Sequence, residues 1–160
     1  MAGDAFGRAI RDRHRGEKTD RLVQRDGPET REHTVDRYLA EIGDEDVAWL
    51  DEYVDGPVLD MGAGAGRFAL SFQDRHETVA IEASEALVET MRSRGVDDAR
   101  RVDMFAVREA FDRDRFETVF SVGTQVGLAG SLPGLRAFLG DLAAVTTPEA
   151  TAVFQLYDPE

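Results

Sequence analysis

One stretch of the sequence decides the fold: Val58-Leu59-Asp60-Met61-Gly62-Ala63-Gly64-Ala65-Gly66-Arg67. Its first half is a short apolar run, typical of a buried strand, and its second half alternates glycine with alanine. Glycine allows unusual backbone angles and the close approach of a ligand. A helix N-terminus after such a turn offers unpaired N–H groups to anions and nucleotides. The stretch therefore predicts a nucleotide-cofactor loop between a strand and a helix.

Strand and helix patterns alternate through the rest of the chain. The region 32–54 is helical and is split into two helices near Gly43-Asp44. Further patterns predict strands at 57–61, 78–82, 99–103, 116–122 and 151–157, and helices at 66–74, 84–94 and 132–145. This alternation predicts an α/β fold. We expect a doubly wound, Rossmann-like parallel sheet in the strand order 3-2-1-4-5, with helices on both faces and N-terminal helices before it.

The chain divides into two segments. Residues 1–30 are polar and rich in arginine, and we expect an N-terminal arm that is partly helical or disordered. An arm that closes over a bound cofactor is the alternative. Residues 31–160 form the expected cofactor-binding domain.

The acidic residue Asp60 discriminates between two classes of cofactor. Dinucleotide sites carry the pattern Gly-x-Gly-x-x-Gly against a pyrophosphate, whereas the third glycine here, Gly66, comes one position earlier. A carboxylate two residues before Gly62 disfavours a pyrophosphate and favours a ligand with an ammonium group. S-adenosylmethionine (SAM) has an amino group, a sulfonium and no phosphate. We therefore expect SAM to be bound by Asp60, Gly62, Ala63, Gly64 and Gly66. The alternative is that Asp60 only braces the turn.

Acidic residues also stand at the ends of the second and third strands. Glu82 can accept hydrogen bonds from both hydroxyls of a ribose, in NAD and SAM sites alike, and Ala83 follows it. Asp103 can accept a hydrogen bond from the amino group of adenine, and Met104 can pack on the purine. The alternatives are an ordinary strand-end acid and a turn acid followed by a core residue. Together these residues predict a nucleoside site.

The fourth strand leads into a loop that begins with Val122 and Gly123. Ligands of doubly wound sheets lie beyond the carboxyl ends of the strands, near the point where the strand order reverses. We therefore expect Val122 and Gly123 to border the cofactor. Thr124 and Gln125 either contact the substrate or stabilise the turn.

The charge balance limits the partners. The chain has 32 acidic against 19 basic residues, and Lys18 is its sole lysine. A net charge of −13 repels phosphate backbones, so we expect no nucleic-acid partner. No apolar run is long enough to span a bilayer and no signal pattern is visible, so we expect a cytoplasmic chain without a membrane partner. The absence of cysteine and the scattered histidines predict no metal site.

The same composition bears on the source. An acidic surface keeps a protein soluble in concentrated salt, where self-repulsion is screened. The near absence of lysine beside abundant Asp and Glu is typical of a halophilic archaeal protein. An acidic protein from a GC-rich bacterial genome is the alternative.

Four motifs, at residues 58–67, 79–84, 99–105 and 116–123, resemble in order and spacing those of class I SAM-dependent methyltransferases. The resemblance covers residues 30–158 and is greatest to the small-molecule type with an N-terminal helical lid, as found in haloarchaea. It implies that the methionine part of SAM, the ribose and the adenine are held, in that order, by Asp60 with Gly62 and Gly64, by Glu82, and by Asp103 with Met104. Tyr38 is a weaker candidate for the methionine carboxylate.

The sequence departs from that family at its end. The family sheet carries strands six and seven as an antiparallel hairpin, and neither is expected here, so the chain is predicted to be truncated after strand five. Strand five at 151–157 is long and apolar, which favours a homodimer through that edge.

The predicted function is methyl transfer from SAM to an unidentified, small-molecule acceptor. Such a displacement mainly requires that nucleophile, methyl carbon and sulfur be aligned. We assign no catalytic residue, because His33 and His76 lie outside the expected pocket loops and no other residue is a convincing general base. Two alternatives remain: an NAD-type oxidoreductase, and a SAM-binding or interaction module without activity.

Overall fold

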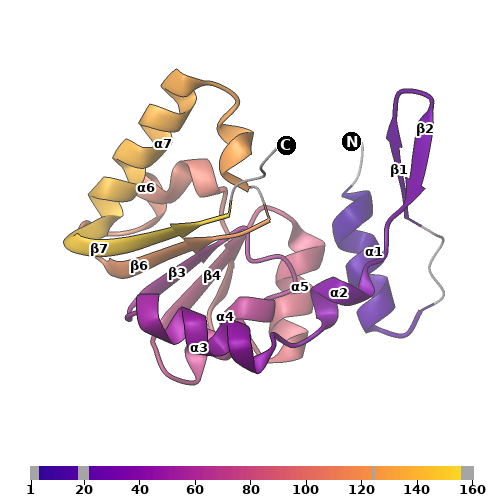
Figure 1. Ribbon diagram of the computed structural model, residues 1–160, viewed down its shortest axis with the longest axis horizontal. Coiled ribbons are helices and arrows are strands. Elements are labelled where there is room, and N and C mark those ends of the chain that lie inside the picture. Colours follow the sequence, from indigo (N-terminus) through magenta and orange to yellow (C-terminus); the bar gives the residue numbers. More distant parts are fainter. Residues whose placement is uncertain (1–3, 18–21, 124, 156–160) are drawn as a thin grey trace.

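The computed structural model describes residues 4–17, 22–123 and 125–155. Its centre is a five-stranded sheet in the order β5-β4-β3-β6-β7, and all four pairs of neighbouring strands are parallel. From the middle outward, the strands are β3 (Val58–Met61), β4 (Thr78–Glu82), β6 (Phe116–Ser121), β5 (Ala99–Arg101) and β7 (Thr146–Phe154). The predicted α/β fold with a Rossmann-like parallel sheet is confirmed (Figure 1).

Helices cover both faces of this sheet (Figure 1). One face carries α6 (Val107–Ala110) and α7 (Leu132–Val145), and the other carries α3 (Asp44–Tyr53), α4 (Arg67–Gln73) and α5 (Glu85–Arg94). Two short 3-10 helices, η1 (Met104–Ala106) and η2 (Gln125–Ala129), follow β5 and β6. Each strand alternates its side chains between the two apolar layers.

The two layers divide the residues of β3 between them. Leu59 and Met61 are fully buried against the α6–α7 face, whereas Val58 packs with Leu50 of α3 and Phe72 of α4. Because side chains alternate along a strand, Asp60 lies on the same face as Val58, under α4. A carboxylate is therefore placed inside an apolar layer at the end of the central strand.

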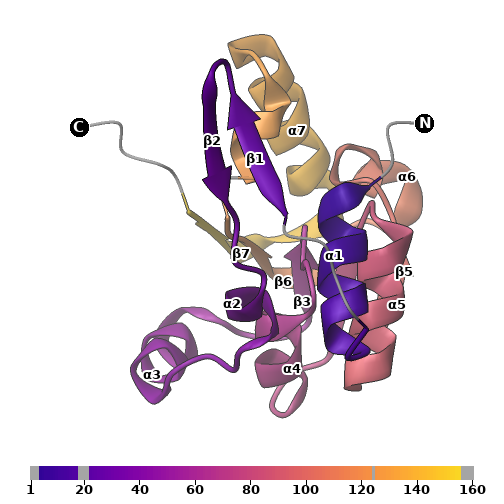
Figure 2. The ribbon, with the colours of Figure 1, turned by 90° about the vertical axis from the view of Figure 1, so that its right-hand side faces the viewer.

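The N-terminal residues lie at the side of the domain. The helix α1 (Ala5–His14) packs along α5, and an antiparallel hairpin of β1 (Val23–Asp26) and β2 (Glu29–Glu32) projects away from it (Figure 2). A short helix, α2 (Asp36–Leu39), then returns the chain toward the sheet. The arm predicted for residues 1–30 contains a helix and a hairpin in its described part; residues 1–3 and 18–21 lie outside the described residues.

The expectation of a fold that lacks strands six and seven is wrong. The described residues form seven strands, and β6 and β7 both belong to the parallel sheet. Two further strands, β1 and β2, precede the sheet, and their residues are polar or solvent-exposed throughout. These two strands lack the apolar alternation that predicts a strand, so the sequence predicted five strands where the described residues form seven.

The last strand also begins earlier than predicted. It starts at Thr146, directly after α7, with a register shift against β6 between Phe116 and Thr118. The sequence placed it at 151–157, of which Leu156 and Tyr157 lie outside the described residues. The first half of the strand contains Pro148 and Glu149, which are rare in strands, so strand propensity did not predict it.

In the part of the chain that the structure describes, no helix combines the length and the apolar character needed to cross a membrane.

Candidate functional site

The glycine loop (residues 62–66) joins the carboxyl end of β3 to α4. Gly62, Gly64 and Gly66 all have positive φ angles, of 64°, 59° and 78°. Side chains rarely adopt that region, so glycine is required by the backbone itself. The loop is tied to β4, because the Ala63 N–H donates to the carbonyl of Ile81 at 3.1 Å.

Two of these glycines have different spatial roles. A Cβ on Gly66 would lie 2.6 Å from Cγ2 of Val96 and 3.0 Å from Cγ of Met91. Gly66 therefore lets α4 pack closely on the region around α5. A Cβ on Gly64 would meet no other protein atom within 4 Å, so Gly64 faces open space. The loop thus offers its backbone at Gly64 to a ligand.

Glu82 braces this loop from the end of β4. One of its carboxylate oxygens accepts from the Gly64 N–H at 3.1 Å, and the other accepts from the N–H groups of Ala83 and Ser84 at 2.9 and 3.2 Å. Burial raises the pKa of Glu82, with a smaller contribution from the negative charge of Asp4, and the three backbone N–H groups oppose the rise. Each carboxylate oxygen has two lone pairs, so the three N–H groups leave Glu82 one lone pair for a further donor, on the oxygen that accepts from Gly64.

Asp60 is the most isolated charge near the loop. Its side chain is 2% exposed, and its Oδ2 atom has no hydrogen-bond partner in the structure. Burial, reinforced by the charge of Glu82, raises the pKa of Asp60 to about 7, and the backbone N–H of Ala69 only partly opposes this. An unpaired buried carboxylate is costly, and a cationic group placed near it would lower that cost.

The glycine loop opens onto a cavity of about 810 Å³. Its walls come from five parts of the chain: the N-terminal elements, α3, the loop with the start of α4, the end of β4 with the start of α5, and the ends of β6 and β7. Aromatic residues line much of it, namely Phe6, Tyr38, Trp49, Phe68, Phe120 and Phe154. Phe68 and Phe120 contact each other with ring centroids 4.9 Å apart. The polar backbone of the loop and the aromatic wall formed by these side chains therefore line the same cavity.

Six of the predicted binding residues line this cavity: Gly62, Ala63, Gly64, Glu82, Val122 and Gly123. Asp60 lies buried in the strand that leads into the loop, and Gly66 lies behind the loop, in contact range of α5 residues. Ala83 is exposed beside Glu82 and is not part of the cavity wall.

The predicted adenine residues are not brought into the cavity. Asp103 is exposed and caps η1 by accepting from the Phe105 N–H at 2.9 Å, and Met104 is 7% exposed within the core that contains Phe138. In the loop after β6, the Gly123 N–H donates to Oε1 of Gln155 at 2.8 Å. Thr124 and the Gln125 side chain lie outside the described part of the chain.

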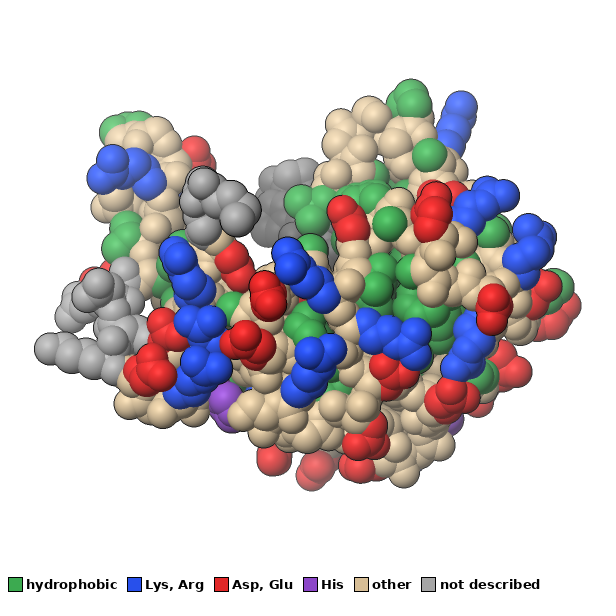
Figure 3. All heavy atoms as spheres, turned by 180° about the vertical axis from the view of Figure 1, so that it is seen from behind, with side chains coloured by type: hydrophobic (Ala, Val, Ile, Leu, Met, Phe, Trp, Pro, Cys, Tyr) green, Lys and Arg blue, Asp and Glu red, His purple; other side chains and the backbone are tan. Residues whose placement is uncertain are grey.

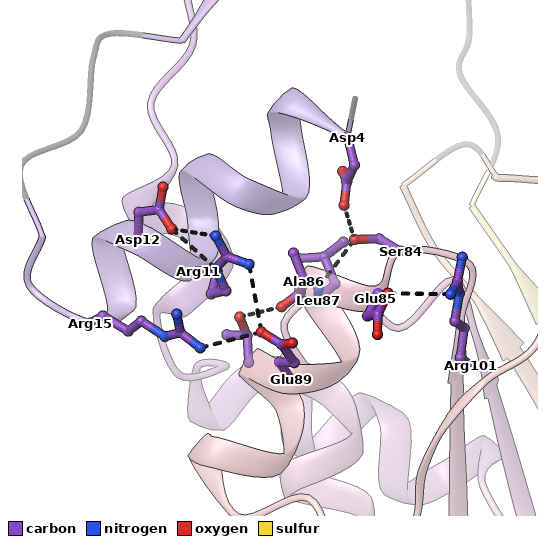
Figure 4. Close-up of polar contacts among 11 residues, drawn as sticks. Asp4, Arg11, Asp12, Arg15, Ser84, Glu85, Ala86, Leu87, Glu89 and Arg101 are labelled. Carbon is purple, nitrogen blue, oxygen red and sulfur yellow. Dashed lines mark hydrogen bonds and ion pairs between the residues drawn. The ribbon is translucent and has the colours of Figure 1, made fainter. Parts of the chain in front are cut away.

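The sequence missed most of the N-terminal contribution. Asp4, Phe6 and Arg37 line the cavity although they lie far from the glycine loop in sequence. The Asp4 side chain caps α1 by accepting from the Gly7 N–H at 2.8 Å and also accepts from the hydroxyl of Ser84, next to Glu82 (Figure 4). A Ser or Asp cap is visible in a sequence, but the helix it would dock against is not.

Tyr38 also lines the cavity, where the family resemblance placed a weaker candidate. Its hydroxyl accepts from Arg37 at 2.7 Å and lies 3.0 Å from Nε2 of His33. His33, which sequence position placed outside the pocket loops, is therefore one hydrogen bond behind the cavity wall. Among the described residues, no cluster of His, Asp and Glu is arranged to hold a metal ion.

The comparisons with known proteins agree with this geometry. Residues 58–149 match a family model described as a methyltransferase domain. A search of curated proteins found no match. The prediction of SAM as the cofactor is confirmed by the matched family and by a similar solved structure that contains S-adenosyl-L-homocysteine.

Solved structures resemble the chain more fully. A SAM-dependent methyltransferase from Bacteroides fragilis, in complex with S-adenosyl-L-homocysteine, is 31% identical with a TM-score of 0.79. The match covers 93% of this chain and 62% of that one, so the chain spans less than two thirds of its length. The CcbJ methyltransferase from Streptomyces caelestis is 20% identical with a TM-score of 0.63, over 78% of this chain and 55% of that chain. The YcgJ protein from Bacillus subtilis is 19% identical with a TM-score of 0.57, over 69% and 49% of the two chains.

The latter two likenesses show the fold alone, whereas the family match spans more than half of the chain and contains the glycine loop, Glu82 and the end of β6. The resemblance to class I methyltransferases is confirmed at this level, and the chain belongs to the methyltransferase domain family.

Proposed function

We propose that this chain binds SAM on the glycine loop and transfers its methyl group to a small-molecule acceptor held against the aromatic wall. The observation that carries the proposal is the joint placement of Gly64, Glu82 and the aromatic residues around one cavity. A cavity of about 810 Å³ falls within the roughly 300–1,000 Å³ of small-molecule sites.

The residues present fit the cationic and hydrogen-bond-donating groups of SAM. The ligand has an ammonium group, a sulfonium and two ribose hydroxyls, which are cations and donors. The loop end of the cavity offers acceptors: Glu82, Asp4 and, beneath the loop, the unpaired Oδ2 of Asp60. Burial raises the pKa values of Asp60 and Glu82 and so disfavours their ionised forms. A bound cation would act in the opposite direction and favour the ionised forms.

When bound, SAM supplies an activated methyl group whose bond to sulfur breaks as the acceptor attacks. The chain's own residues then have positioning work. The loop backbone fixes the methionine end, and Glu82 orients the ribose through its remaining lone pair. Phe68 and Phe120 form a dry surface that excludes water and holds the acceptor in line.

Asp103 and Met104 belong to the proposal as the adenine site. Arg101 of β5 pairs in register with Glu82 of β4, and Asp103 follows two residues later at the same edge of the sheet. An adenine attached to a ribose at Glu82 would extend along this edge. Asp103→Ala should then weaken SAM binding without changing the position of the ribose.

A homodimer through β7 is a second part of the proposal. This strand lies at the edge of the sheet, where Thr151 and Ala152 are exposed. Exposed strand edges pair readily with another chain. Sedimentation at increasing concentration should show dimers, and a strict monomer at high concentration would remove this part.

Calorimetry with S-adenosyl-L-homocysteine tests the binding site. Glu82→Gln should weaken binding at least about tenfold, because an amide has one acceptor oxygen and cannot keep the three N–H bonds of the carboxylate and also accept a ribose hydroxyl. Glu85→Gln is the matched control: Glu85 lies three residues later, at the start of α5, and pairs with exposed Arg101 at 3.3 Å. Absence of binding by the unaltered chain at millimolar ligand, or equal affinity of the two variants, would contradict the proposal.

A further inference from the structure

The N-terminal wall of the cavity, which we define as Asp4, Phe6, Arg37 and Tyr38, rests on an apolar cluster. Ile10 of α1, Leu87 of α5 and Ala65 of the glycine loop are all buried in it. Phe6, Val35, Tyr38 and Leu39 pack against its edge. The wall and the loop therefore share one small core, separate from the cores on the two faces of the sheet.

Arg94, in the last turn of α5, connects the same two parts by hydrogen bonds. Its Nη1 donates to the carbonyl of Ala65 at 2.7 Å and, more weakly, to that of Tyr38 at 3.4 Å. Its Nη2 donates to the carbonyl of Leu39 at 2.8 Å. One guanidinium thus spans the glycine loop and the end of α2.

This arrangement uses what distinguishes arginine from lysine. The planar guanidinium presents several N–H groups in a fixed fork, so acceptors on two segments are held at a set separation. Arg94 is partly buried, and burial lowers its pKa, while the charge of Glu41 opposes this. A partly desolvated charge is costly to leave without its hydrogen-bond acceptors.

Two ion pairs between α1 and α5 are exposed to solvent. Arg11 and Arg15 of α1 reach Glu89 of α5 at 3.6 and 3.3 Å, in the view of Figure 4. The exposed fractions of the three side chains are 24% for Arg11, 48% for Arg15 and 44% for Glu89, so these ion pairs contribute little to stability. None of these three residues touches the glycine loop.

We propose that Arg94 is a positioning residue for the cofactor: it holds the glycine loop and the N-terminal wall as one unit, so that ligand binding on the loop also orders the wall. This inference rests on the proposed SAM site. It assigns Arg94 a role through Ala65 and Tyr38 rather than through contact with the ligand, since Arg94 is absent from the cavity wall.

The test compares Arg94→Ala with Arg92→Ala. Arg92 is in the same helical turn and donates to the carbonyl of Ala99 at 2.8 and 3.2 Å, on β5 and away from the cavity. Arg94→Ala should weaken S-adenosyl-L-homocysteine binding at least about tenfold, and Arg92→Ala by less than about twofold. Arg94→Lys, with one ammonium in place of the fork, should fall between the unaltered chain and Arg94→Ala.

Amide hydrogen exchange separates positioning from plain stability. In the unaltered chain and in Arg92→Ala, the ligand should slow exchange in both 36–39 and 62–66. In Arg94→Ala it should slow exchange in 62–66 alone. A lower melting temperature with unchanged affinity, or with both segments still protected by ligand, would overturn the inference.

Two other results also discriminate between the alternatives: an Arg94→Ala variant that does not fold, and an unaltered chain that binds no ligand. If Arg94→Ala does not unfold cooperatively, Arg94→Lys carries the test, and full affinity with full protection of both segments overturns the inference. If the unaltered chain binds no ligand, the proposed function fails. Exchange without ligand then decides: faster exchange of 36–39 and 62–66 together in Arg94→Ala, but not in Arg92→Ala, still supports the coupling, and no change overturns it.

Discussion

The floor of the cavity and its N-terminal wall are built in different ways. The floor consists of the glycine loop and the strand ends beneath it; all four residues of β3 are buried, and the loop is hydrogen-bonded to β4. The wall is attached from outside by the Ile10 cluster, by Arg94 and by exposed ion pairs to Glu89. Parts of a protein with few buried contacts open locally, while a central sheet opens only in global unfolding.

This difference predicts how each region responds to change. Substitutions in the floor should lower the stability of the whole domain. Substitutions in the wall should loosen the wall and leave the sheet folded. Four measurements test this division.

The largest effect should come from Asp60 as the pH changes. Its pKa is raised from 3.8 to about 7 in the folded chain. Between these values the unfolded chain releases the proton and the folded chain keeps it, so the free energy of unfolding falls as pH rises. The difference of about 3 in pKa corresponds to at most about 4 kcal/mol, complete near pH 7 and absent below pH 4. The raised pKa of Glu82 acts in the same direction.

Urea denaturation of the ligand-free chain from pH 4 to pH 8 measures this slope. Asp60→Asn should remove most of it, and Asp74→Asn, which changes one exposed charge, should leave it unchanged. Equal slopes for the Asp60→Asn variant and the unaltered chain would mean that Asp60 is not the protonated group.

Two buried isoleucines compare floor and wall directly. Ile81 of β4 and Ile10 of α1 are both fully buried. Truncation of either to alanine removes the same atoms, which costs about 2–5 kcal/mol in a core. Ile81→Ala should lower the free energy of global unfolding by about 3 kcal/mol. Ile10→Ala should lower it by about 1 kcal/mol, because the cost is limited to the docking energy of the N-terminal elements.

Hydrogen exchange on the same two variants locates the loss. Ile10→Ala should speed exchange in residues 5–14 and leave β3 and β4 unchanged. If both variants lowered the free energy of global unfolding equally, the wall and the floor would unfold as one unit, which would contradict the division.

Within the floor, Gly66 and Gly64 form a matched pair. Both have positive φ, so alanine at either position is strained by about 1 kcal/mol. At Gly66 the added Cβ also meets Val96 and Met91, which adds a packing penalty and brings the cost to about 2–3 kcal/mol. Thermal melting should therefore rank Gly66→Ala below Gly64→Ala in stability, while Gly64→Ala should have the greater effect on ligand affinity, since its Cβ enters the open space of the cavity. The reverse order in melting temperature would contradict the packing role of Gly66.

The floor is also the part that the sequence predicts well. Glycines that need positive φ, an acid at the strand end and buried apolar strands are local signals, and the residues that they singled out, Gly62, Gly64 and Glu82, line one cavity. The predicted strands at 57–61 and 78–82 correspond to β3 and β4 within one residue. Local rules are sufficient here because the strand, the turn and the helix are consecutive in the chain.

The wall depends on contacts between distant residues, which no local pattern carries. Arg94 and Ala65 are 29 positions apart, and Asp4 and Ser84 are 80 apart. The hairpin of β1 and β2 is solvent-exposed on both sides, so it lacks the alternation that marks a half-buried strand. Asp103 and Met104 were predicted from their position at the end of the third strand, and in the structure Asp103 caps η1 and Met104 is in the core.

The smallest effect should come from Glu89, where α1 is paired to α5 on the surface. Glu89→Gln removes its ion pairs with Arg11 and Arg15 and should cost less than about 1 kcal/mol in dilute buffer. At molar salt the Debye length is about 3 Å, so the difference between variant and unaltered chain should vanish.

The net charge of −13, with acidic and arginine side chains interspersed over the face in Figure 3, means that salt also relieves repulsion across the molecule. The unaltered chain should therefore melt at a higher temperature in concentrated salt even as the Glu89 pairs lose their effect. A melting temperature that falls with salt would show instead that exposed ion pairs, rather than the Ile10 cluster and Arg94, hold the wall in place.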